Sequence, residues 1–339
     1  MKHAYLQYIA YHLPDDILDN ETLSVRYPEW SVAKIEEKTS IKYRHICKQD
    51  ETAGDLALKA AEKLLDEYEI NKEEIDFVIL CTQSPDYFLP TTACLLQDKL
   101  GLSKKCGAFD FNLGCSGFIY GLGIAKGLIV SSQANKILLI TSETYSKYIH
   151  PDDKSNRTIF GDAAAASLIS ATEIEKGLNA KINDFEYNTD GGGGDLLIVK
   201  NGGSRFPVKN GLDVVDENGN IRNDNHLFMD GKAIFNYTAF EVPKMIKSVL
   251  EKNNITLSDI DVAVFHQANA YMLNIVRSRC NIPSEKFYIN LQDVGNTVSS
   301  TIPIALKRAI EDKTIHNGAK VLLAGFGVGL SMGATVLTT

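Results

Sequence analysis

Cys115 is the first residue of this sequence whose type and position suggest chemistry. It lies in FDFNLGCSGFIYGL (109–122), which reads as a strand that breaks at 112–114 and continues as an apolar helix. A thiol at a helix N-terminus faces unpaired N–H groups and the positive end of the helix dipole. We expect this position to lower the thiol pKa toward or below neutrality and to yield a nucleophilic thiolate. The alternative role, open to the other five cysteines as well, is a small buried apolar residue.

His266 and Asn296 supply the polar groups that a thiol nucleophile needs. His266 lies in VFHQAN (264–269), directly after an apolar run, and the small and amide residues behind it suit the floor of a cavity. A histidine in this place is otherwise a structural residue. Asn296 lies in the turn GNT (295–297) before an amphipathic helix, where it either caps the helix or directs its amide into a site.

The segments that must position these side chains repeat within the chain. Residues 63–81 match 248–266 without gaps, each reading as a helix, a polar turn and a β-rich run. Residues 135–143 match 319–327 at nearly the same offset. Chance similarity is the alternative, but two matches in the same order favour a duplicated α/β domain.

The duplication predicts the fold class and the domain organisation. We expect two similar α/β halves, 1–173 and 174–339, packed as one five-layer αβαβα unit. Continuous apolar runs such as FVIL and VAVF are typical of parallel strands buried on both faces. The register places Cys81 and His266 at the carboxyl ends of equivalent strands, the edge where ligands gather in open α/β sheets. His266 and Cys115 are therefore expected to meet near the pseudo-symmetry axis.

Composition excludes several classes of function. The 339 residues carry a net charge of −8 with no long run of one sign, which argues against a nucleic-acid partner. No stretch approaches the ~18 apolar residues of a membrane span, and the first residues lack the pattern of a signal peptide. The six cysteines form no CxxC pair and no zinc-like cluster, so free thiols without a metal or other cofactor are expected in a cytoplasmic protein.

Two segments rich in Gly, Asn and Asp, 190–207 and 214–225, are read as turns and a surface excursion. The four consecutive glycines of the first segment suggest a phosphate loop as the alternative. No GK[ST] follows and no helix opens directly behind them, which favours a turn.

Several motifs together resemble the β-ketoacyl–acyl-carrier-protein synthase III family. GCSGF, HQAN, GNT and GFGVG occur in the order and spacing of that family, and 38–61 and 157–166 are similar to it as well. The resemblance runs from about residue 30 to the end of the chain. It implies a thiolase-like fold, a homodimer in which the strand near 108–112 pairs across the interface, and a place in fatty-acid biosynthesis.

The resemblance also implies a catalytic triad of Cys115, His266 and Asn296. Cys115 would take an acyl group from a thioester, a malonyl-acyl-carrier protein would then lose CO2, and its enolate would attack the acyl-Cys. His266 and Asn296 would donate hydrogen bonds to the thioester carbonyl. Further residues are expected to support the site, either by binding the oxyanion through backbone N–H groups or by keeping the cavity dry: Gly327, Val328, Phe326 and Asn269.

The sequence departs from the family pattern for binding coenzyme A. Trp30 lies nine residues before Thr39, and Lys154 stands where an arginine is expected, with Arg157 displaced. Lysine does not reproduce the planar bidentate contacts of arginine. We therefore hypothesise that the acyl donor is bound to a carrier protein, or is not the short acyl-CoA that starts fatty-acid synthesis.

Basic residues near the C-terminus offer a possible docking patch for the acyl carrier protein, although solvated helix faces explain them equally well: Arg277, Arg279, Lys307 and Arg308. The segment SPDYFLPTT (84–92) resembles a family loop that reaches into the acyl tunnel of the neighbouring subunit. Leu89, flanked by Phe88, matches the residue at the end of that tunnel.

Three functions remain open on the sequence alone. Decarboxylative condensation is favoured, because simple acyl transfer to an alcohol or amine does not require the asparagine. A catalytically silent partner in a heterodimer is the third possibility, and the joint presence of Cys115, His266 and Asn296 argues against it. Acyl chain length and the choice between a primary and a specialised pathway are not fixed by the sequence.

Overall fold

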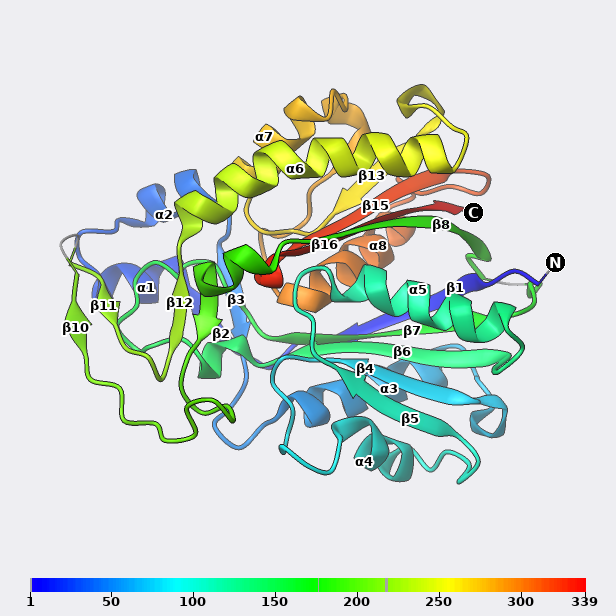
Figure 1. Cartoon of the computed structure of the whole chain (residues 1–339), viewed down its shortest axis with the longest axis horizontal. Helices are drawn as coiled ribbons and strands as arrows, with labels where there is room; N and C mark the ends of the chain where they lie inside the picture. The colour runs from blue at the N-terminus through cyan, green and yellow to red at the C-terminus, as the bar shows by residue number, and fades with distance from the viewer. Residues whose placement is uncertain (1, 176, 217–218) are drawn as a thin grey trace.

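The structure is a computed structural model that describes residues 2–175, 177–216 and 219–339. Its main feature is a set of ten hydrogen-bonded strands (Figure 1). In spatial order these strands are β14 (Phe287–Tyr288), β13 (Val262–Phe265), β15 (Lys320–Gly327), β16 (Ser331–Thr338), β8 (Ala180–Thr189), β1 (Tyr5–His12), β7 (Ala163–Ser170), β6 (Lys136–Glu143), β4 (Phe77–Cys81) and β5 (Gly107–Phe111).

The two halves of this strand set have the same order and the same directions. In the first, β4 runs parallel to β5 and β6, and β7 is antiparallel to both β6 and β1. In the second, β13 runs parallel to β14 and β15, and β16 is antiparallel to both β15 and β8. The halves join where Tyr5 and Leu6 of β1 pair with Lys181 and Ala180 of β8. This correspondence supports the duplication, and the predicted boundary at 173/174 falls between β7 and β8.

Helices complete five layers, which Figure 1 shows from top to bottom. The central pair, α5 (Gly117–Val130) and α8 (Thr301–Glu311), is packed between the two groups of strands. The outer helices are α3 (Ala53–Glu67) and α4 (Thr92–Lys99) on one side, and α6 (Gly231–Lys252) and α7 (Ala270–Arg279) on the other. The expected αβαβα arrangement is therefore confirmed.

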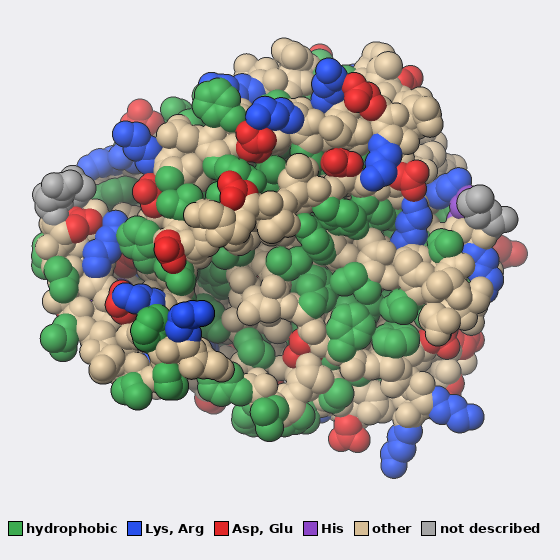
Figure 2. Space-filling view, in the orientation of Figure 1, with side chains coloured by type: hydrophobic (Ala, Val, Ile, Leu, Met, Phe, Trp, Pro, Cys, Tyr) green, Lys and Arg blue, Asp and Glu red, His purple; other side chains and the backbone are tan. Residues whose placement is uncertain are grey.

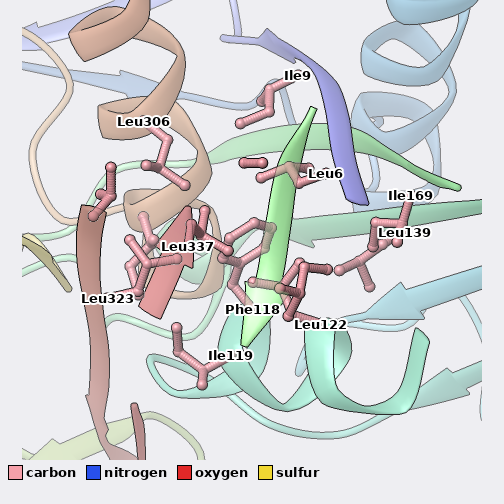
Figure 3. Close-up of a cluster of buried hydrophobic side chains, with 14 of the residues drawn as sticks. Leu6, Ile9, Phe118, Ile119, Leu122, Leu139, Ile169, Leu306, Leu323 and Leu337 are labelled. Atoms are coloured by element: carbon pink, nitrogen blue, oxygen red, sulfur yellow. The ribbon is translucent and has the colours of Figure 1, made fainter. Parts of the chain in front are cut away.

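The core follows from these layers. Helix α5 has almost no polar side chains because it faces strands of both halves. Figure 3 shows Phe118 and Leu122 of this helix against Leu6, Leu323 and Leu337 from the strands, all of them 1% exposed or less. This packing fixes the start of α5, and with it the segment that carries Cys115.

The remaining elements lie at one end of the layers. They are α1 (Asn20–Arg26), α2 (Val32–Thr39), β2 (Asp16–Asp19), β3 (Tyr43–Ile46), β9 (Leu197–Val199), β10 (Val214–Val215), β11 (Ile221–Arg222) and β12 (Leu227–Met229). Short 3-10 turns are η1 (Lys72–Glu74), η2 (Tyr145–Lys147), η3 (Gly191–Leu196), η4 (Leu257–Asp259), η5 (Ser284–Lys286), η6 (Val298–Ser300) and η7 (Val328–Leu330). The four glycines predicted as a turn form η3, and the predicted surface excursion contains the hairpin β10–β11.

Three properties of the described residues bear on function. Within the described ranges, no helix is long and apolar enough to cross a membrane. The same residues contain no group of three or more His, Cys, Asp or Glu side chains arranged to hold a metal ion. All six cysteines are free thiols. Figure 2 shows acidic and basic side chains interspersed over the visible face.

Candidate active site

Cys115 lies in the turn between β5 and α5, two residues before the helix begins at Gly117. Its side chain is 5% exposed and belongs to an apolar cluster with Tyr145, Phe160 and Leu330. The opposite wall approaches closely, since a Cβ atom on Gly327 would lie 2.8 Å from the sulfur of Cys115. Glycine is needed at 327 for this approach, and it brings the backbone of η7 to the thiol.

A cavity of about 130 Å³ joins the three predicted catalytic side chains, which come from three separate segments of the chain. Cys115 comes from the first half, while His266 and Asn296 come from the second. The supporting residues Phe326, Gly327 and Asn269 also line this cavity. Most of the other lining residues are apolar and include Ile159, Phe160, Leu197, Ile234 and Met272.

His266 follows the last residue of β13, and its backbone N–H donates to the carbonyl of Ala324 (2.8 Å). Its Nδ1 atom is 2.7 Å from the Thr301 hydroxyl, which also lies 3.0 Å from the carbonyl oxygen of Val298. The single hydroxyl proton serves one acceptor at a time. When the hydroxyl proton of Thr301 points to the Val298 carbonyl, the ring proton of His266 is on Nδ1. When the hydroxyl proton points to Nδ1, the ring proton is on Nε2.

Phe326 lies next to this histidine, as expected. The two ring centroids are 5.8 Å apart at an interplanar angle of 85°. Phe326 is 2% exposed, so its ring keeps water from that side of the imidazole.

Asn296 lines the cavity, but it does not cap α8, whose N-cap residue is Ser300. Its Oδ1 accepts a hydrogen bond from the backbone N–H of Val298 (2.9 Å), which closes the turn before α8. Its backbone is held by Ile159 and Gly161 through bonds of 2.9 and 3.0 Å. Among the described residues, no protein acceptor pairs with Nδ2, so this amide group can donate to a substrate.

Burial controls the charges of the site and corrects one expectation. It raises the pKa of the Cys115 thiol to about 12, with the Glu143 carboxylate adding to the shift, although N–H groups of Val328 and Cys115 oppose it. The expected lowering of the thiol pKa is therefore wrong for the free protein. Burial also lowers the pKa of His266 to about 3. At neutral pH the pair consists of a neutral thiol and a neutral imidazole.

Glu143, the last residue of β6, is a buried group that sequence reasoning missed. Its carboxylate accepts hydrogen bonds from the Gln83 N–H (3.0 Å) and from the hydroxyls of Ser84 (3.1 Å) and Ser299 (2.9 Å). Burial nevertheless raises its pKa to about 8. The only signal in the sequence was an acidic residue at the end of an apolar strand.

A second pocket, of about 470 Å³, opens beside the cavity and shares four lining residues with it: Ile159, Met229, Gly231 and Asn269. Its rim carries Trp30, Lys38 and Arg222. The Lys34 and Lys38 amines lie 5.1 and 5.0 Å from the indole centroid. Arg222 comes from the β10–β11 hairpin, and no motif pointed to it in the sequence.

Lys154 and Arg157, which were predicted to contact coenzyme A, make their contacts elsewhere in the chain. Lys154 forms an ion pair with Glu29 (3.0 Å). Arg157 donates to the backbone carbonyls of Ile149 and His150, both at 3.1 Å. Neither residue lines the second pocket. The nine-residue separation of Trp30 from Thr39 does not keep Trp30 away, because α2 fills that interval and both residues reach the pocket.

Two residues of the possible carrier-docking patch, Lys307 and Arg308, form ion pairs within the chain, and the patch itself stays a prediction. Lys307 is 9% exposed and pairs with Glu67 (2.9 Å), and Arg308 pairs with Asp293 (2.6 Å). Arg277 donates to the carbonyl of Ile282, and Arg279 lies over the ring of Phe240. Neither of these two arginines lines the cavity or the second pocket.

The predicted tunnel residues Phe88 and Leu89 do not reach the cavity of their own chain. Their side chains are 90% and 83% exposed. Phe88 lines a groove of about 720 Å³ together with Tyr145, Tyr148 and Val328, and Cys115 does not line this groove.

Comparisons with known proteins agree with this geometry. Residues 109–191 match the family model of 3-oxoacyl-[acyl-carrier-protein] synthase III, and residues 250–339 match its C-terminal model. A β-ketoacyl-[acyl-carrier-protein] synthase III of Clostridium perfringens strain 13 is 37% identical, with 99% of each chain covered.

Solved structures with the same description are also similar. A crystal structure of a 3-oxoacyl-(acyl-carrier-protein) synthase III is 44% identical, with a TM-score of 0.96 and coverage of 99% of this chain and 100% of the other. A 3-oxoacyl-(acyl-carrier-protein) synthase from Burkholderia xenovorans LB400 is 32% identical, with a TM-score of 0.90 and coverage of 99% and 94%.

Proposed function

This chain belongs to the 3-oxoacyl-[acyl-carrier-protein] synthase III family, and we propose that it condenses an acyl thioester with a malonyl-acyl-carrier protein, releasing CO2. The observation that carries the proposal is the joint position of Cys115, His266 and Asn296 on one largely apolar cavity. A thiol, an imidazole and an unpaired amide donor are the groups that an acyl-Cys condensation requires.

In the first half-reaction, the Cys115 sulfur attacks the thioester carbonyl and its proton passes to Nε2 of His266. The raised pKa of the thiol requires this base, because little thiolate exists beforehand. The N–H groups of Cys115 and Val328 bind the oxyanion. The carbon–sulfur bond of the donor then breaks, the departing thiolate takes the proton from His266, and an acyl-Cys remains.

In the second half-reaction, the malonyl thioester loses CO2 while its carbonyl oxygen becomes an enolate. Nδ2 of Asn296 donates to this oxygen, and Nε2 of His266 donates in the tautomer in which the Thr301 hydroxyl points to Nδ1. The enolate carbon attacks the acyl-Cys carbonyl, and the carbon–sulfur bond to Cys115 then breaks, which releases a β-ketoacyl thioester and leaves a thiolate on Cys115. This thiolate takes up a proton from solvent, which restores the neutral thiol. An apolar site favours decarboxylation, because the negative charge moves from the carboxylate to the enolate oxygen, where the fixed N–H donors bind it.

The second pocket supports acyl-CoA as the donor. Trp30 offers a flat surface to a nucleotide base, and Lys38 and Arg222 offer cations to phosphates. The hypothesis of a carrier-bound donor stays a prediction, and these residues speak against it. Comparing the rates of Cys115 acylation by acyl-CoA and by acyl-carrier protein decides between them.

We further propose that the chain works as a homodimer. In the described residues, β5 is hydrogen-bonded on one edge alone, through β4. Pairing with β5 of a second copy would satisfy the other edge and cover the exposed Phe88 and Leu89. Light scattering after size-exclusion chromatography tests this, and a stable monomer would contradict it.

The function itself is tested by adding an acyl donor and then malonyl-acyl-carrier protein, while intact mass and CO2 are followed. Condensation predicts an acyl adduct on Cys115, then its loss with one CO2 per turnover. An adduct without later decarboxylation would indicate acyl transfer to another acceptor. The absence of any adduct would indicate a catalytically silent chain.

A further inference from the structure

A series of hydrogen bonds joins the turn that carries Cys115 to the turn that carries Asn296. Its members, in order along the series, are Asn112, Gln83, Glu143 and Ser299. The first member lies three residues before Cys115, and the last lies three residues after Asn296. Because these turns belong to different halves of the chain, the series crosses from one half to the other.

Gln83 makes the contacts at the Cys115 end. Its Nε2 donates to Oδ1 of Asn112 (3.0 Å), and its Oε1 accepts from the hydroxyl of Tyr145. The same amide group packs against Gly114, the residue before Cys115, since a Cβ atom there would lie 2.5 Å from Oε1 of Gln83. Both ends of the amide are therefore engaged, and the group lies directly against the turn.

The backbone of Gln83 continues the series into the interior of the protein. Its N–H donates to Oε2 of Glu143 (3.0 Å), and the Ser299 hydroxyl donates to Oε1 of the same carboxylate (2.9 Å). The side chains of Glu143 and Ser299 are 0% and 1% exposed. Water does not replace a bond that is broken at such a depth, and the group that loses its partner stays unpaired. A displacement of the Asn296 turn relative to Gln83 is therefore unfavourable.

Neither turn depends on this series alone for its structure. The backbone of Asn296 is also bonded to Ile159 and Gly161, and α5, which follows Cys115, packs at the centre of the core. Cutting the series should therefore shift the two turns relative to each other without unfolding either of them.

We propose that Gln83 is a positioning residue for the condensation step. Through Glu143, it sets the position of the Cys115 sulfur relative to the Asn296 amide. This inference rests on the proposed condensation, in which the two groups act together only in the second half-reaction. The enolate that Asn296 binds must then reach the carbonyl carbon of the acyl-Cys, and a small misplacement of reacting groups slows such a step strongly. In the first half-reaction, Cys115 works with His266 and backbone N–H groups, and the Asn296 amide is not needed.

The experiment follows acyl-Cys formation and CO2 release in single turnovers, with acetyl-CoA and then malonyl-acyl-carrier protein. Gln83→Leu removes the side-chain bonds at one end of the series, and Ser299→Ala removes the bond to Glu143 at the other end. Each variant is expected to release CO2 about tenfold more slowly and to form the acyl-Cys within about threefold of the unmodified rate. The double variant should also be about tenfold slower in CO2 release, and not about a hundredfold, because a series that is cut once no longer connects the turns.

Gln97→Leu is the matched control, because this half-buried glutamine of α4 donates to the carbonyl of Leu102 (2.6 Å) within its own segment. It should change neither rate. Normal CO2 release by both single variants would overturn the inference, and so would an equal slowing of the two steps or effects that multiply in the double variant. If Gln83→Leu does not fold, Asn112→Ala cuts the series at the same end and takes its place. An unmodified chain that forms the acyl-Cys but releases no CO2 would contradict the proposed function itself.

Discussion

The Ser299 hydroxyl donates a 2.9 Å hydrogen bond to Oε1 of Glu143, which ties the turn after Asn296 to the end of β6. Oε2 of the same carboxylate accepts from the N–H of Gln83 and the hydroxyl of Ser84. One buried carboxylate thus joins the catalytic turn of the second half to the loop that holds Tyr145. Its charge lies close enough to Cys115 to raise the pKa of that thiol.

Glu143 predicts a specific dependence of stability on pH. Burial raises its pKa from the ordinary 4.5 to about 8, so between these values the folded chain holds a proton that the unfolded chain has lost. The free energy of unfolding contributed by this group therefore falls as pH rises from about 4.5 to about 8. The side chain of the Glu143→Gln variant does not titrate, so this variant lacks the decrease. The free energy of unfolding of Glu143→Gln, relative to that of the unmodified chain, should therefore rise by a few kcal/mol between pH 5 and pH 8.5.

Urea unfolding at the two pH values measures this effect. Glu62→Gln is the matched control, because Glu62 is exposed and the same chemical change there should give no pH-dependent difference. The prediction would be contradicted if the free energies of unfolding of Glu143→Gln and of the unmodified chain differed by the same amount at both pH values. The Glu143 carboxylate would then be ionised over the whole range.

The thiol of Cys115 should react with iodoacetamide slowly at neutral pH. Its raised pKa leaves little thiolate, so the alkylation rate should increase about tenfold for each pH unit from 7 to 9, without the plateau of a preformed thiolate. Peptide mapping by mass spectrometry follows Cys115 separately from the exposed Cys94. Rates that are independent of pH above 7 would restore the original expectation of an activated thiol.

Sequence patterns predicted the residues of the site better than its electrostatics. The repeated segments and the motifs around Cys115, His266 and Asn296 are short stretches of consecutive residues, so they can be recognised in the sequence. The structure brings these three residues together. The thiol pKa could not be predicted because it depends on burial within a cluster that includes Tyr145 and Phe160. Helix position favours a thiolate, but desolvation dominates here.

Long-range contacts explain the other misses. Lys307 and Arg308 read as exposed helix residues, yet their partners Glu67 and Asp293 are remote in sequence or lie on another segment. Arg222 reaches the second pocket because the β10–β11 hairpin folds back toward Trp30. No pattern within one segment reports such a contact.

Thr301 is predicted to act as a positioning residue for His266. Thr301→Val removes the hydroxyl 2.7 Å from Nδ1 and leaves that atom without its partner. Acylation and condensation should both slow, by about tenfold to a hundredfold, because the imidazole loses the hydroxyl that orients it and that serves Nδ1 in both tautomers. Thr301→Ser keeps the hydroxyl and should recover most of the rate. Single-turnover acylation and CO2 release, measured from pH 5 to pH 9, separate this role from general destabilisation, since loss of packing alone would not alter the pH profile.

Asn296 should matter for one half-reaction and not for the other. Its Oδ1 is engaged by the N–H of Val298, whereas Nδ2 is directed to the second substrate's carbonyl in the proposed mechanism. Asn296→Ala should therefore leave the acylation of Cys115 within about threefold, and slow decarboxylation of the malonyl thioester by about a hundredfold to a thousandfold. Asn296→Asp retains the turn-closing oxygen but replaces the donor with a carboxylate, so it should be at least as impaired in decarboxylation. The two rates are read from the mass of the acyl-Cys and from released CO2 in the same sample. If Asn296→Ala condensed at the normal rate, the enolate would have to be stabilised by His266 alone, and the assigned role of the amide would be wrong.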